Sequence, residues 1–60
     1  MWYWKIYLKD GDEEVAVRSK YNIASMEEAL NEVLDIVDYI NLEIHKLGID
    51  SKVDFKVSPQ

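Results

Sequence analysis

The feature that most limits the fold is one stretch, residues 26–47, in which apolar side chains recur every three or four positions. This spacing places them along one side of an α-helix, as a single stripe formed by Met26, Leu30, Val33, Val37, Ile40, Ile44 and Leu47. A chain of 60 residues has room for one such helix and little else. Because a one-sided helix needs another layer against its apolar face, the flanking segments must supply that layer.

Both ends of the predicted helix carry recognisable signals. Ser25 is followed three residues later by Glu28, a capping box in which the hydroxyl accepts a hydrogen bond from a free backbone N–H. Lys46 lies in the last turn and Gly48 just beyond it, which is the usual ending of a helix. We therefore predict a helix that begins after Ser25 and ends before Gly48.

Three other segments alternate between apolar and polar residues with period two, as strands with one buried face do. The predicted strands are residues 2–8, 13–20 and 52–58, and their inward side chains would be Trp2, Trp4, Ile6, Leu8, Val15, Val17, Val53, Phe55 and Val57. The dipeptide Asp10-Gly11 predicts a tight hairpin turn. Pairing through that turn would set Ile6 against Val15 and Trp4 against Val17, and a longer loop that shifts the pairing by two would keep the same faces.

The element order predicts a single α+β domain over residues 1–60. A right-handed crossover through the helix brings the third strand beside the first, so we expect a three-stranded antiparallel sheet in the order 2-1-3 with the helix on one face. The chain has no cysteine, so large core side chains must replace disulfides. It also lacks a signal-peptide pattern and a membrane-spanning apolar run, and we expect a cytoplasmic protein.

Although the net charge is only −5, the predicted fold places most basic and most acidic side chains on different surfaces. Every basic residue except Lys46 would point to the open face of the sheet beside Tyr3 and Tyr7, namely Lys5, Lys9, Arg18, Lys20, Lys52 and Lys56. The outer side of the helix would carry Glu28, Glu32, Asp35 and Asp38, with Tyr39 and Leu42 among them.

Each of these surfaces has two interpretations. The six helix residues Glu28, Glu32, Asp35, Asp38, Tyr39 and Leu42 either keep the protein soluble or occupy a basic groove of a macromolecular partner in place of phosphates. The sheet face is either solvated or a nucleic-acid-binding surface on which bases stack on tyrosines and phosphates meet basic side chains, formed by Tyr3, Lys5, Tyr7, Arg18, Lys20, Lys52 and Lys56. A structural or assembly subunit is the third possibility.

The sequence offers little for catalysis. Its one histidine, His45, is explained by favourable charge near a helix C-terminus, and no nucleophile, phosphate-loop or metal-ligand motif is present. We expect a protein without enzymatic activity, cofactor or metal.

The difference in length between the predicted helix and the predicted strands indicates self-association. A helix of some 22 residues is about 33 Å long, whereas a seven-residue strand covers about 24 Å. The helix should therefore outrun its sheet and leave apolar residues near its C-terminal end uncovered, so we expect a homodimer.

The segment Ser25-Met26-Glu27-Glu28-Ala29-Leu30 after a hairpin resembles the start of HicB-like antitoxin modules. The glycine- and cysteine-containing turns of that family and its separate DNA-binding segment are absent, so no function is carried over. In size and acidity the chain is similar to small phage-encoded inhibitors such as anti-CRISPR proteins. That similarity implies a phage or mobile-element inhibitor of a host nuclease.

Overall fold

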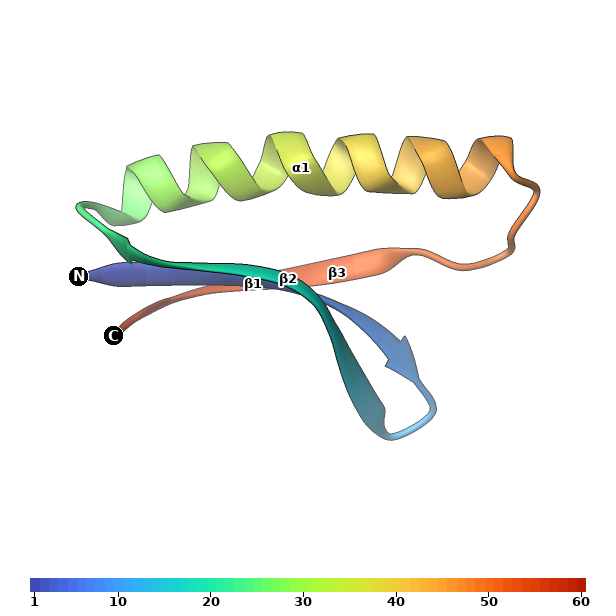
Figure 1. Cartoon of the computed structure of the whole chain (residues 1–60), viewed down its shortest axis with the longest axis horizontal. Coiled ribbons are helices and arrows are strands. Elements are labelled where there is room, and N and C mark those ends of the chain that lie inside the picture. Colours follow the sequence, from blue (N-terminus) through green and yellow to red (C-terminus); the bar gives the residue numbers. More distant parts are fainter.

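The computed structural model describes residues 1–60 except for the side chain of Asp10. It contains β1 (Trp2–Asp10), β2 (Glu13–Ile23), α1 (Met26–Lys46) and β3 (Val53–Pro59), in that order (Figure 1). The strands form one antiparallel sheet in the order β2-β1-β3, with α1 on one face. The α+β class, the strand order and the single covering helix are confirmed.

Both helix ends follow their sequence signals. The Ser25 hydroxyl accepts a hydrogen bond from the backbone N–H of Glu28 at 3.1 Å, so Ser25 caps the first turn. At the other end the N–H of Leu47 donates to the carbonyl of Glu43, and Gly48 takes a positive φ of 73°. Glycine adopts this conformation without a steric cost, so the helix ends there.

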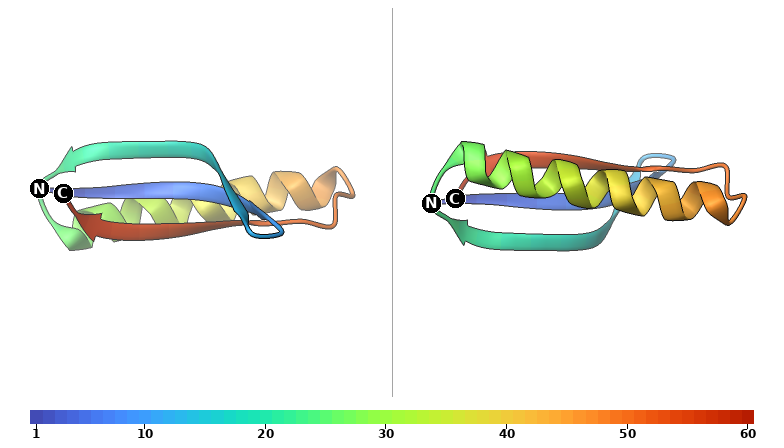
Figure 2. Two further views of the ribbon diagram at one scale, coloured as in Figure 1. Left: turned by 90° about the horizontal axis from the view of Figure 1, so that it is seen from below. Right: turned by 90° about the horizontal axis from the view of Figure 1, so that it is seen from above.

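The core lies between α1 and the face of the sheet that it covers. Its buried side chains are Trp4, Ile6, Ile23, Ala29, Val33, Val37 and Val53. Seen from above, α1 lies over β1 and β3, while β2 runs to one side and scarcely touches it (Figure 2). The central strand therefore supplies the largest core side chain, Trp4, as its alternation predicted.

The pairing of β1 with β2 differs from the prediction. The loop is Gly11-Asp12, because Asp10 pairs with Glu13, and Gly11 supplies a positive φ of 63° at the first loop position. Further along, Ile6 pairs with Arg18 and Trp4 with Lys20, so the predicted register was wrong.

The different loop shifts the register by two residues, and two β-bulges in β2 shift it further. One extra residue lies between Ala16 and Arg18, and another between Lys20 and Ile23, where Asn22 adopts a φ of 61°. Directly paired residues of an antiparallel sheet share a face, so Arg18 and Lys20 lie on the side that α1 covers and not on the open face.

The predicted burial of Val15 and Val17 was wrong, although Val15 pairs with Leu8 and so stays on the side of the sheet that α1 covers. Both side chains are 51% exposed. The far half of the β1–β2 hairpin bends away from α1, so the helix does not cover this part of β2 (Figure 1). A bulge strengthens strand twist, which accounts for the direction of the bend.

The outer edge of β3 is capped by side chains. The backbone N–H of Val53 donates to Oδ1 of Asn41 at 2.8 Å, and Nδ2 of Asn41 donates to the Val53 carbonyl at 3.4 Å. The N–H of Phe55 donates to its neighbour Asp54 at 2.8 Å, and Pro59 has no N–H. These groups are therefore not free to pair with another strand, which is a common protection of sheet edges.

Candidate partner-binding site

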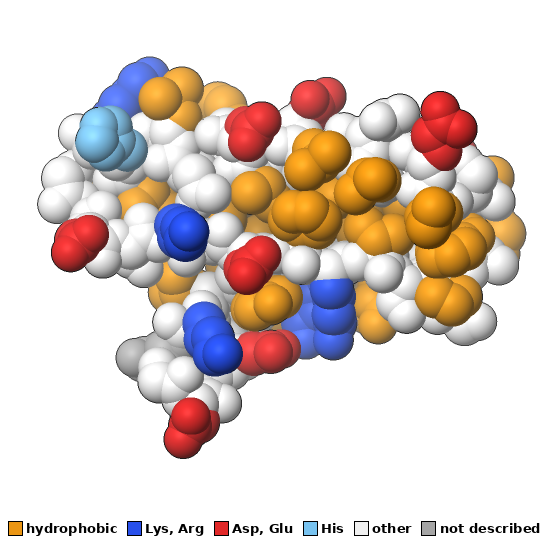
Figure 3. Space-filling view, turned by 180° about the vertical axis from the view of Figure 1, so that it is seen from behind, with side chains coloured by type: hydrophobic (Ala, Val, Ile, Leu, Met, Phe, Trp, Pro, Cys, Tyr) orange, Lys and Arg blue, Asp and Glu red, His pale blue; other side chains and the backbone are white. Residues whose placement is uncertain are grey.

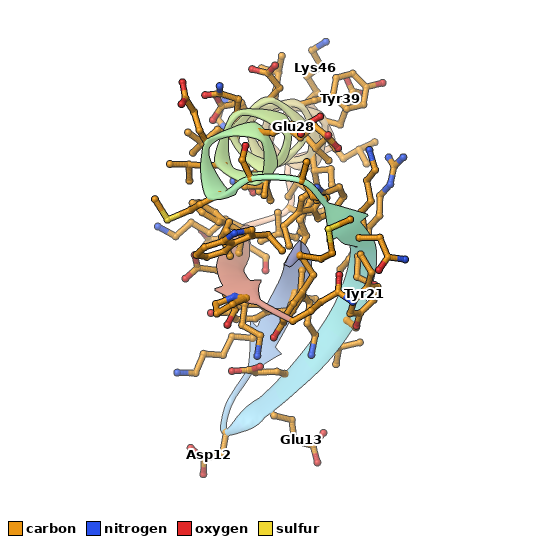
Figure 4. The ribbon with its side chains drawn as sticks, turned by 90° about the vertical axis from the view of Figure 1, so that its left-hand side faces the viewer. Asp12, Glu13, Tyr21, Glu28, Tyr39 and Lys46 are labelled. Carbon is orange, nitrogen blue, oxygen red and sulfur yellow. The ribbon has the colours of Figure 1, made fainter. Side chains whose placement is uncertain are left out.

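The outer side of α1 carries carboxylates without basic partners. Glu28, Asp35 and Asp38 are exposed, and no basic side chain described by the structure forms an ion pair with them. Tyr39 is 65% exposed and Leu42 52% exposed on the same side. Viewed along the helix, Tyr39 and Lys46 project away from the sheet (Figure 4). Five of the six predicted helix residues thus share one accessible surface.

Glu32, the sixth predicted residue, has a different role. Its carboxylate accepts a hydrogen bond from Nζ of Lys20 at 2.9 Å and another from the indole Nε1 of Trp4 at 3.4 Å. The Lys20 hydrogen bond, with a smaller contribution from Trp4, lowers the pKa of Glu32 although partial burial opposes it. Glu32 therefore connects α1 to β2 and β1 and is not a free carboxylate.

The open face of the sheet is less basic than predicted. Arg18 and Lys20 lie on the other face, and Lys52 precedes β3 on an exposed segment. What remains is centred on Lys5 and Lys56, which pair directly across β1 and β3. Like charges opposite one another destabilise a sheet, so this pair is not there to stabilise the fold.

An aromatic pair adjoins these lysines. The rings of Tyr3 and Tyr21 stack with centroids 5.1 Å apart and planes inclined by 20°. Tyr3 and Tyr7 were predicted on this face, but Tyr21 was missed. No local pattern marks Tyr21, because the bulge beside Asn22 decides which way its side chain points.

The C-terminal end of α1 leaves apolar side chains uncovered, as its length predicted. Leu47 is 74% exposed and Ile49 52% exposed, and the helix continues past the sheet above the segment that leads to β3 (Figure 1). His45 is exposed in this last turn, where positive charge is favoured.

Three general features complete the description. Leaving the Asp10 side chain aside, no three acidic or histidine side chains converge as metal ligands would. In the described part of the chain, no helix combines the length and apolarity needed to cross a bilayer. Comparison with protein-family models, curated proteins and solved structures found no match, so function has to be inferred from the surfaces themselves.

Proposed function

We propose that this chain is a noncatalytic binding protein whose α1 helix occludes a basic surface on a macromolecular partner. The surface that binds is the acidic face, defined as Glu28, Asp35, Asp38, Tyr39 and Leu42. The observation that carries the proposal is the combination of unpaired carboxylates with two exposed apolar side chains on one side of one helix.

Carboxylates and apolar side chains contribute differently to such binding. Asp35 and Asp38 attract a positively charged partner over a distance and raise the association rate. Tyr39 and Leu42 supply contact area that leaves water on binding, and tyrosine is among the residues that most often dominate interface energy. A face that served solubility alone would not need Tyr39 at 65% exposure.

The concrete form of the proposal is an inhibitor of a nucleic-acid enzyme in the cytoplasm, encoded by a phage or mobile element. A nuclease groove holds phosphates with lysine and arginine, and a rigid helix bearing carboxylates presents similar negative charge to it. The inhibitor would act as a homodimer. In this account neither a cofactor nor a metal takes part.

Charge reversal tests the proposal. Asp35→Lys with Asp38→Lys should abolish capture of the nuclease from host extract and restore its activity. Asp12→Lys with Glu13→Lys is the matched control, because it changes the charge equally at the hairpin tip, far from α1 (Figure 4). Equal capture by the two double variants would refute the acidic face as the binding surface.

A second candidate is favoured by the Lys5–Lys56 pair beside the stacked Tyr3 and Tyr21. This arrangement could hold single-stranded nucleic acid, with phosphates at the lysines and a base on an exposed tyrosine ring. Labelled single- and double-stranded oligonucleotides, titrated at low salt, test it. Binding that is lost with Tyr3→Ala and Lys5→Ala supports this candidate, and no binding by the unaltered chain removes it.

A further inference from the structure

A second apolar surface lies on the flank of α1 that overhangs β3. Met26, Leu30 and Leu34 are 52%, 37% and 41% exposed, above half-buried Phe55 and Val57. We call these five residues the β3-side patch. Seen from behind, hydrophobic side chains gather across α1 and β3 (Figure 3).

Hydrogen bonds identify the side of α1 to which these leucines belong. Asn41 bonds to Val53 of β3, and Leu34 lies seven residues earlier, two turns along the same flank. Glu32, which bonds to Lys20 of β2, lies on the opposite flank. The β2 flank is charged, so only the β3 flank offers an apolar surface.

We propose that a second copy of this chain covers the β3-side patch, across a two-fold axis that passes near Val57 and normal to the sheet. This inference rests on the homodimer of the proposed function and identifies its interface. The axis keeps both helices on the same side of the two sheets, antiparallel and next to each other.

Chain geometry shows which residues the proposed axis brings together. Asn41 lies beside Val53, and β3 runs opposite to α1. With a rise of about 3.3 Å per strand residue and 1.5 Å per helix residue, Val57 lies beside α1 between Leu30 and Leu34. The two-fold axis therefore sets Leu30 of one copy against Leu34 of the other, so the patch is complementary to itself.

Helix spacing agrees with this arrangement. Figure 2 shows α1 over β1 and β3, and a helix axis midway between these two strands would lie half a strand spacing inside β3. If the two β3 strands approach to the usual spacing of about 4.8 Å, the helices lie about 10 Å apart, within the range of packed helices. The Val53 and Phe55 N–H groups are capped and Pro59 has none, so Val57 is left to pair across the axis at this strand spacing, and side chains make the rest of the contact.

Size and charge determine how strong the contact is. Each copy would bury on the order of 500 Å², less than a standard stable interface, so the dimer is weak and forms at high concentration. Glu27 and Asp38 border the patch on the solvent side, and the axis brings Glu27 of one copy near Asp38 of the other. Added salt screens this repulsion and strengthens the dimer, whereas it weakens binding through the acidic face.

Sedimentation equilibrium at low and high salt tests the interface. The unaltered chain should dimerise at high concentration, more tightly in high salt, and Leu34→Glu should weaken the dimer by at least about tenfold. Leu42→Glu is the matched control, since it makes the same change at a similarly exposed leucine on the acidic face. A dimer unaffected by Leu34→Glu, or a chain that stays monomeric in high salt, overturns the proposal.

A cross-linking experiment covers the case in which Leu34→Glu fails to fold. The chain has no cysteine, so Leu30→Cys with Leu34→Cys should form an intermolecular disulfide between positions 30 and 34 on oxidation. Absence of that link overturns the proposed axis. Asp35→Lys alone changes the acidic face on the outer side of α1, away from the contact between the copies. Loss of nuclease capture by this variant is therefore independent of both results, and failure of the dimer and failure of the acidic face are distinguishable.

Discussion

Asn41 offers the sharpest test of how α1 is joined to the sheet, because its side-chain amide bonds to both backbone groups of Val53. Replacing it by alanine removes the 2.8 Å bond and the 3.4 Å bond together. A net hydrogen bond contributes about 1 kcal/mol to the free energy of unfolding, and the longer bond, near the limit of good geometry, about half of that.

Alanine also raises helix propensity by about 0.5 kcal/mol, which offsets part of the loss. Asn41→Ala should therefore destabilise the fold by about 1 kcal/mol. Asn31→Ala is the control, because Asn31 is exposed on the outer side of the same helix and makes neither bond. It should gain about 0.5 kcal/mol, so the two variants should differ by about 1.5 kcal/mol.

Urea denaturation followed by tryptophan fluorescence measures both variants, at concentrations low enough to keep them monomeric. In thermal unfolding a difference of about 1.5 kcal/mol corresponds to roughly 6–12 °C in Tm for a domain of this size. Equal stabilities for Asn41→Ala and Asn31→Ala would refute the bond between α1 and the edge of β3.

Three further predictions concern the cap, the core and the Glu32 cluster. Ser25→Ala should lower the free energy of unfolding by about 1 kcal/mol through loss of the helix cap, with a matching fall in helical circular dichroism on mild heating. Val33→Ala, at a fully buried position, should lower the free energy of unfolding by about 2–3 kcal/mol in denaturant titration. Val17→Ala, on the uncovered hairpin, should lower it by less than about 0.5 kcal/mol. Similar losses for the two variants would contradict the observed bulge. The lowered pKa of Glu32 stabilises the fold at pH values above the ordinary glutamate pKa, and this stabilisation is lost as pH falls through the folded pKa. Glu32→Gln should therefore flatten the acid side of a plot of Tm against pH. An unchanged slope would contradict the Lys20 contact.

The parts of the fold that depend on local pattern could be predicted from the sequence. Local patterns predict the helix stripe, the Ser25 cap and the alternation around Trp4 and Phe55. The short chain leaves few ways to combine these elements. The strand order follows from the preference for right-handed crossovers.

The pairing of β2 could not be predicted from alternation. Alternation assigns Arg18 and Lys20 to the open face, yet the bulge between Ala16 and Arg18 moves both to the side that α1 covers. A bulge depends on the twist of the hairpin and on what each partner strand presents, neither of which is visible in the segment itself. Asn22, a residue that tolerates positive φ, is the one local hint.

The same limit applies to the candidate surfaces. Helical periodicity placed Asp35, Tyr39 and Leu42 correctly because it needs no knowledge of a partner strand. It could not show that Glu32 is held by Lys20 and Trp4, since that contact depends on the bulged register of β2. Tyr21 was missed for the same reason.

Whether the acidic face of α1 binds a basic surface can be measured through the salt dependence of partner affinity. With the captured partner purified, the dissociation constant is measured over a range of salt for the unaltered chain, for Asp35→Lys with Asp38→Lys, and for Asp12→Lys with Glu13→Lys. We expect a steep loss of affinity with salt for the unaltered chain and the hairpin control, and weak binding with little salt dependence for the helix variant. The same salt slope and affinity in all three would contradict this expectation.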